Sequence, residues 1–81
     1  MNHHQLLAAL REAGVSDSSY GIMVSDLPRS KYIQETIPVL VEKADGRWTI
    51  EAWERGQHWT EASFDTETDA CAYLYAYLVN Q

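Results

Sequence analysis

The sequence predicts an α+β domain, in which an N-terminal and a C-terminal helix pack on one face of a single antiparallel sheet of three to four strands. Three observations predict this class. Apolar residues recur at helical spacing near both ends of the chain, the middle alternates apolar and polar residues, and an Asp-Gly pair separates two alternating segments. With 81 residues, the chain is too short for two ordinary domains, so residues 1–81 are expected to form one domain.

The two helices are predicted from apolar spacing and from their end signals. The first covers residues 3–13, with Asn2 as a candidate N-cap and Gly14 free to take the positive φ that closes a helix. The last covers residues 66–79 and starts with acidic residues, which the helix dipole favours there. Its inward face is predicted to hold Ala70, Cys71, Leu74, Tyr77 and Leu78.

The residues between the helices are expected to form the sheet. Residues 20–24 are a short apolar run that predicts a strand, and residues 25–36, which contain a proline and no clear period, predict a loop. Residues 37–44, 47–54 and 58–64 are predicted to form three antiparallel strands joined by tight turns.

Turn geometry sets the predicted register of these strands. A two-residue Asp45-Gly46 turn pairs each residue of the strand 37–44 with a defined partner in the strand 47–54. A three-residue second turn stacks Trp48 on Phe64, whereas a two-residue turn would place polar residues on the apolar face. The predicted core face, on which the helices pack, is Ile37, Val39, Val41, Trp48, Ile50, Ala52, Ala62 and Phe64.

The opposite face of the predicted sheet is the candidate binding site. It is predicted to hold Leu40, Glu42, Glu51, Trp53, Trp59 and Glu61. In this register Trp53 lies opposite Trp59, and Glu51 lies opposite Glu61 as a like-charge pair that folding alone would disfavour. Exposed tryptophans among carboxylates are typical of an interaction patch. The alternative is that the tryptophans cover a second small core under the loop 25–36.

Charge limits the classes of partner. Six Lys and Arg residues against twelve Asp and Glu residues give a net charge of −6, which argues against nucleic acid and anionic membranes and favours a basic protein. The N-terminus lacks the cationic and apolar regions of a signal peptide, the one cysteine forms no internal disulfide, and no stretch predicts a transmembrane helix. The expectation is a cytoplasmic protein.

No catalytic, cofactor-binding or metal-binding motif is recognisable, so the chain is not expected to be an enzyme. Adjacent His3 and His4 are expected to be exposed to solvent, and His58 to pair across the strands with Glu54. Cys71 is expected to be a small buried apolar residue. A hydrolase built on Glu51 and Glu61 is disfavoured because a flat sheet face offers no pocket. Three tyrosines are expected at the edge of the core, with an aromatic box as the alternative: Tyr73, Tyr75 and Tyr77.

Several local motifs resemble those of a known family. They are Gly46-x-Trp48, Trp53-Glu54-Arg55-Gly56 and Phe64-x-Thr66-Glu67-x-x-Ala70-Cys71-x-Tyr73-Leu74, together with the helix from Leu6 to Gly14 that is followed by Tyr20. On these motifs about two-thirds of the chain resembles the small bacterial immunity proteins that accompany polymorphic toxins and contact-dependent growth inhibition systems. Members tend to have an aromatic residue at the position of Trp53. Residues 25–36 have no counterpart there, so the toxin stays open.

The resemblance implies a cytoplasmic antitoxin that binds one cognate toxin domain in a 1:1 complex and blocks it, without a cofactor. A basic nuclease-type toxin would complement the acidic surface, and complementary charge speeds association. The alternative function is an acidic regulatory or adaptor module, or a homodimer that buries the face of Trp53 and Trp59.

Overall fold

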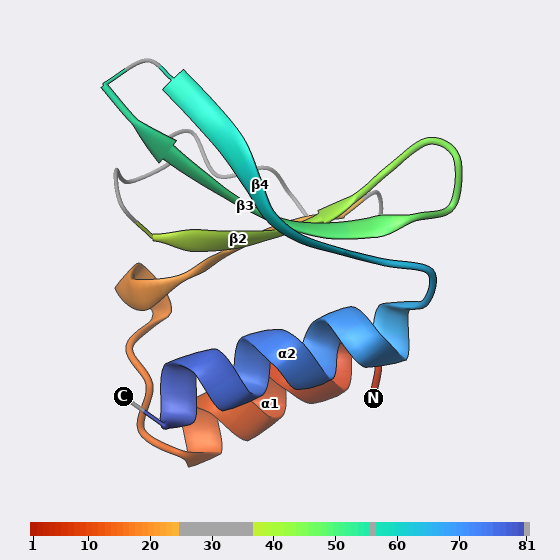
Figure 1. Ribbon diagram of the computed structural model, residues 1–81. Helices are drawn as coiled ribbons and strands as arrows, with labels where there is room; N and C mark the ends of the chain where they lie inside the picture. Colours follow the sequence, from red (N-terminus) through yellow and green to blue (C-terminus); the bar gives the residue numbers. More distant parts are fainter. Residues whose placement is uncertain (25–36, 56, 81) are drawn as a thin grey trace.

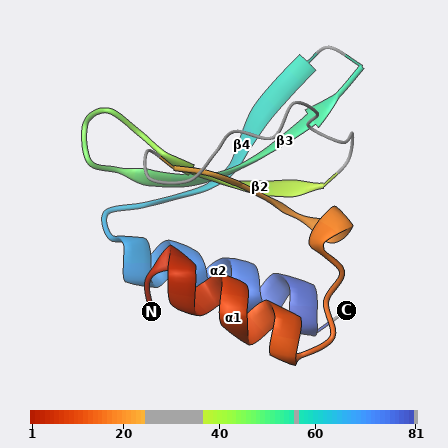
Figure 2. The same cartoon turned by 180° about the vertical axis from the view of Figure 1, so that it is seen from behind.

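The computed structural model describes residues 1–24, 37–55 and 57–80 and confirms the α+β class (Figure 1). Two helices lie side by side on one face of a four-stranded sheet (Figures 1 and 2). The elements in chain order are α1 (His3–Glu12), the 3₁₀ turn η1 (Asp17–Ser19), β1 (Gly21–Met23), β2 (Pro38–Glu42), β3 (Trp48–Glu54), β4 (Gln57–Phe64) and α2 (Glu67–Val79). The loop expected over residues 25–36 and the turn residue Gly56 lie outside the described residues.

The sheet has the strand order β1-β2-β3-β4 and is mixed rather than wholly antiparallel. Strands β2, β3 and β4 are antiparallel neighbours as predicted, whereas β1 pairs with β2 in parallel, with Ile22 beside Leu40. A parallel pair needs a connection of about a dozen residues or more, and the chain from Val24 to Ile37 is long enough. The prediction of a purely antiparallel sheet is therefore wrong at its first strand.

Helix α1 begins and ends where its end signals predict. The Asn2 side chain accepts a hydrogen bond from the Gln5 backbone N–H at 2.8 Å, and the Gln5 side chain accepts one from the Asn2 N–H at 2.9 Å. This reciprocal capping box satisfies two backbone donors at the start of the helix. At the other end, Gly14 takes a φ of +81°, and Val15 donates its N–H to the Leu10 carbonyl.

Thr66 is the N-cap of helix α2, and its hydroxyl accepts a hydrogen bond from the Asp69 N–H at 3.2 Å. The two helices run parallel, so their first turns are adjacent (Figure 1). There Glu67 accepts the backbone N–H of His3 at 2.8 Å and lies 2.5 Å from its Nδ1. The carboxylate therefore caps α1 from the neighbouring helix. The expectation of a solvent-exposed His3 is wrong, because its side chain is only 12% exposed.

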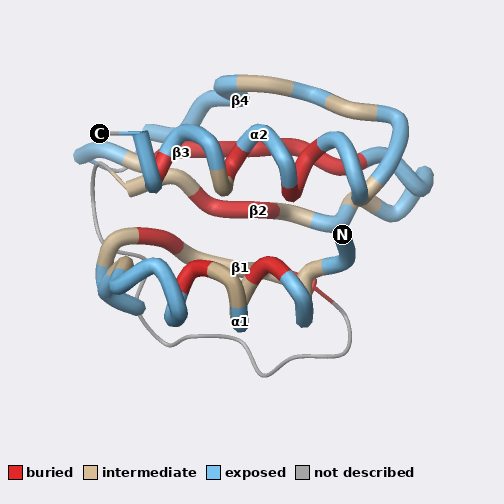
Figure 3. The backbone as a smooth tube through the Cα atoms, turned by 90° about the horizontal axis from the view of Figure 1, so that it is seen from below, coloured by how far each residue is buried: buried red, intermediate tan, exposed pale blue. Residues whose placement is uncertain are grey.

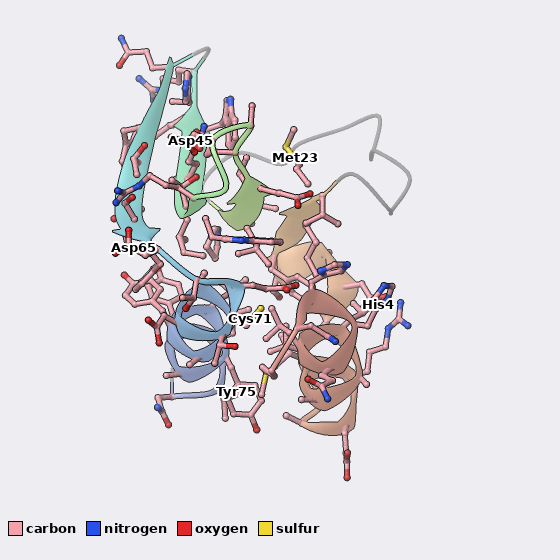
Figure 4. The ribbon with its side chains drawn as sticks, turned by 90° about the vertical axis from the view of Figure 1, so that its right-hand side faces the viewer. His4, Met23, Asp45, Asp65, Cys71 and Tyr75 are labelled. Carbon is pink, nitrogen blue, oxygen red and sulfur yellow. The ribbon has the colours of Figure 1, made fainter. Side chains whose placement is uncertain are left out.

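The core lies between the helices and the middle of the sheet (Figure 3). Burial is concentrated in β2 and β3, while β4 is mostly exposed. Cys71 points from α2 toward α1, in agreement with the predicted inward face (Figure 4). The core residues are Leu6, Leu10, Tyr20, Val24, Leu40, Trp48, Ile50, Ala70, Cys71, Leu74 and Leu78. Tyr77, predicted to be inward, is 48% exposed, and Tyr75 packs against the core instead.

The predicted register between β2 and β3 is wrong by one residue. Leu40 pairs with Ile50 and belongs to the core, whereas Val39 pairs with Glu51 and, like Val41, lies on the face turned away from the helices. The cause is the turn. Gly46 donates its N–H to the Lys43 carbonyl at 3.1 Å and takes a φ of +88°, which is the three-residue loop with a glycine bulge rather than the two-residue turn.

The register between β3 and β4 is right at one end and wrong at the other. Trp48 pairs with Phe64 and Ile50 with Ala62, as the apolar pattern predicts. The next pair joins Glu51 to Thr60, which leaves Glu61 unpaired as a β-bulge. Beyond the bulge Trp53 pairs with His58, Ala52 with Trp59 and Glu54 with Gln57, so the second turn holds two residues instead of three. The expected pairings of Trp53 with Trp59 and of Glu51 with Glu61 are wrong.

Candidate binding groove

The six residues predicted to form one binding face are divided between four environments. Leu40 is 0% exposed in the core, and Glu51 is 2% exposed on the face turned away from the helices. Trp53, half-buried, shares that face with Glu51, from which it is two residues away on β3. Glu42 is exposed beside Trp48 on the helix side of the sheet. Only Trp59 and Glu61 meet, and they do so at a groove.

This acidic aromatic groove lies between β4 and α2 and has a volume of about 120 Å³. The bulge at Glu61 accounts for its position, because a bulge bends its strand and increases the local twist. The free end of the β3–β4 hairpin rises away from the helices (Figures 1 and 2). The groove is lined by Pro38, Ile50, Ala52, Glu54, Trp59, Glu61, Tyr73 and Tyr77.

Three aromatic rings form the sides of the groove. Trp59 on β4 is 41% exposed, and Tyr73 and Tyr77 on α2 are 37% and 48% exposed. The two tyrosines are one helical turn apart, with ring centroids 6.4 Å apart at an interplanar angle of 18°, and Phe64 supports Tyr73 at 5.4 Å. The rings of Tyr73 and Tyr77 thus line the groove. Large rings left this exposed on a small domain are typical of a binding surface.

Two carboxylates complete the groove. Glu61 accepts a hydrogen bond from the Trp59 indole Nε1–H at 2.5 Å, which fixes the ring beside the acid. Glu54 comes from the outer end of β3, and within the described part of the chain no hydrogen bond or ion pair engages its carboxylate. None of the described residues that line the groove is a lysine or arginine. Within the part of the chain that the structure describes, the lining therefore carries negative charge without a lining cation.

On the opposite face the fold compensates its buried acid. Glu51 lies 2.6 Å from Lys43 Nζ, accepts from the Thr49 hydroxyl at 2.6 Å, and has His58 Nε2 at 3.7 Å. Burial by itself raises the pKa of Glu51, but the hydrogen bonds from Lys43 and Thr49 and the neighbouring charges outweigh it and hold the pKa below its ordinary value. His58 therefore faces Glu51, not Glu54 as expected, and its ring stacks on Trp53 at 5.3 Å.

Three further observations concern possibilities considered from the sequence. Burial raises the pKa of the Cys71 thiol to about 11, so the group is poorly suited to act as a nucleophile near neutral pH. Within residues 1–24, 37–55 and 57–80 no cluster of three or more His, Cys, Asp or Glu side chains is arranged to hold a metal ion. No helix in the same residues is long and apolar enough to cross a membrane.

No protein-family model, curated protein or solved structure matches the chain. The resemblance to immunity proteins therefore depends on the sequence motifs alone. What the geometry itself defines, over the described residues, is a small α+β domain with an acidic aromatic groove. Sequence reasoning missed Glu54 as a member of this groove, and it preferred core packing for Tyr73 and Tyr77. The spacing of these tyrosines by four residues was the available signal.

Proposed function

We propose that this protein is an immunity protein that binds and neutralises a basic bacterial toxin domain, and that the acidic aromatic groove is the centre of its interface. The observation that carries the proposal is that three exposed rings lie together with two carboxylates, and that the described lining residues include no lysine or arginine to balance them. Tryptophan and tyrosine are enriched among the residues that dominate binding energy, and uncompensated acids attract a basic partner.

The overall charge supports the same class of partner. A net charge of −6 on a small domain speeds its encounter with a cationic protein, and speed matters when the toxin acts at low copy number. The motif resemblance is the reason for naming a toxin as the partner. The acids and rings of the groove are the reason for expecting that partner to be basic. The alternative function, an acidic regulatory or adaptor module, would use the same acidic and aromatic groove.

The two tryptophans of the hairpin provide a matched test, because Trp59 lies in the groove and Trp53 on the opposite face. The partner domain is first sought among the products of the neighbouring genes and is then titrated calorimetrically with the full chain. Trp59→Ala is expected to raise Kd by about 30-fold or more, which corresponds to about 2 kcal/mol. Trp53→Ala is expected to stay within about twofold of the parent protein. Circular dichroism checks that both variants fold.

Two results would overturn the proposal. One is equal Kd values for the parent and Trp59→Ala. The other is a larger loss for Trp53→Ala, which would move the interface to the opposite face. Self-association is tested by sedimentation at micromolar concentration. A symmetric dimer through the groove would bring Glu54 and Glu61 close to the same acids of the second copy. Like charges that face each other repel, so a monomer is expected.

A further inference from the structure

The size of the acidic aromatic groove limits what it can hold. Its volume of about 120 Å³ is well below the ~300–1,000 Å³ of pockets that enclose small-molecule ligands. The buried residues Ile50 and Ala52 form its floor, and the rings of Trp59 and Tyr77 come from different elements at its sides. A groove of this shape fits the head of one long side chain.

The chemistry of the lining selects a cation. Aromatic faces carry negative electrostatic potential, and tryptophan attracts cations most strongly of the three rings found in proteins. Glu54 and Glu61 add two formal charges, and among the described residues of the lining no lysine or arginine competes for them. The apolar floor accepts the methylene stem of a long basic side chain while its head meets the acids.

Arginine satisfies this lining better than lysine. A guanidinium group is planar, so it can stack on a ring face and still direct its N–H donors sideways to carboxylates. A lysine ammonium is a compact, strongly hydrated charge that cannot stack. Because the indole of Trp59 is held by its hydrogen bond to Glu61, a ring and an acid are already placed together.

We propose that the groove binds the guanidinium group of one arginine side chain presented by the partner protein. This assignment rests on the proposed function for the nature of the partner, a basic protein, but it concerns the free groove and can be tested without the toxin.

The test is an NMR titration of the ¹⁵N-labelled full chain with N-acetyl-arginine amide. The expected result is a saturable shift of the Trp59 indole and of the Tyr73 and Tyr77 backbone amides, with a dissociation constant in the millimolar range. N-acetyl-citrulline amide, the neutral isostere, is expected to produce no saturable shift, and N-acetyl-lysine amide to bind at least about fivefold more weakly.

Conservative variants assign the binding to the groove. Glu54→Gln and Glu61→Gln keep the side-chain size and are each expected to weaken arginine binding at least about fivefold. Glu12→Gln removes one acid from α1, outside the groove, and is expected to leave the constant unchanged. The amide spectrum of each variant shows directly whether it folds.

The outcomes are distinct from those of the toxin experiment. Equal binding of citrulline, tighter binding of lysine, or no saturable shift with arginine would each overturn the arginine assignment, even where toxin binding depends on Trp59. Saturable arginine binding in the groove, together with toxin binding that is indifferent to Trp59→Ala, would overturn the proposed function and leave the arginine site standing.

Discussion

Replacing the buried acid Glu51 by glutamine tests whether its negative charge is stabilised by neighbouring side chains on the sheet face turned away from the helices. The Glu51 side chain is 3% exposed and has hydrogen-bonding partners in Lys43 and Thr49, both at 2.6 Å. Both donors meet the same carboxylate oxygen, Oε2, so a glutamine oxygen can keep both hydrogen bonds but not their charge assistance, which is worth about 1.5–3 kcal/mol for the two together. Because Lys43 is 41% exposed, solvent screening places the expected loss near the lower figure, about 1.5 kcal/mol.

The assay is urea unfolding of the parent and Glu51→Gln between pH 7 and pH 3. Because the folded-state pKa of Glu51 is depressed, its contribution to stability is present above the unfolded pKa of about 4.3 and is lost as pH falls through the folded value. The stability difference between the two proteins is therefore largest near pH 7 and narrows in acid. Glu12→Gln, an exposed control, is expected to stay within about 0.5 kcal/mol. A difference that is absent at pH 7, or that widens in acid, would refute the reasoning.

Two predictions concern the region where the helices meet. Glu67→Gln weakens the cap on the first turn of α1 and is expected to lower the free energy of unfolding by about 1–2 kcal/mol. The assay is thermal unfolding, in which each kcal/mol corresponds to a fall of about 4–8 °C in Tm. An unchanged Tm would show that the contact with His3 does not stabilise the protein. Cys71 is buried and its pKa is raised to about 11, so Ellman's reagent at pH 8 is expected to modify the native protein at least about 100-fold more slowly than the protein in urea. Equal rates would mean that the thiol is accessible.

Local signals predicted the helices well because each is set by residues close in sequence. Asn2 and Thr66 cap the first turns of the two helices with their side-chain oxygens. Gly14, which has no side chain, takes the positive φ that ends α1. The register of β2 could not be settled in this way. Residues 39–41 are all apolar, so the sequence allows either Leu40 or the two valines beside it to face the core. The Asp45-Gly46 pair is compatible with both a two-residue and a three-residue loop.

The candidate site depended on registers that local signals did not determine. The predicted face required Leu40 and Glu51 to be exposed, and the shift of one residue in β2 together with tertiary burial places both out of reach of a partner. The bulge at Glu61 has no marker in the sequence, since neither a glycine nor a proline lies beside it. One feature of the predicted face is present, because a tryptophan and a glutamate do meet at Trp59 and Glu61.

That single unpaired residue decides what kind of surface the hairpin presents. In a regular ladder continued from Trp48 and Phe64, Trp53 would pair with Trp59 and both rings would share one flat face. The bulge transfers Trp59 to the side of α2, where it lies across the groove from Tyr73 and Tyr77. The acids follow the same division. Glu51 is balanced by Lys43 on one side, whereas Glu54 and Glu61 line the other with no cation among its described lining residues. A cationic group that entered the groove would meet these two acids and the exposed rings together, and its binding to the folded state alone would raise the stability of the domain.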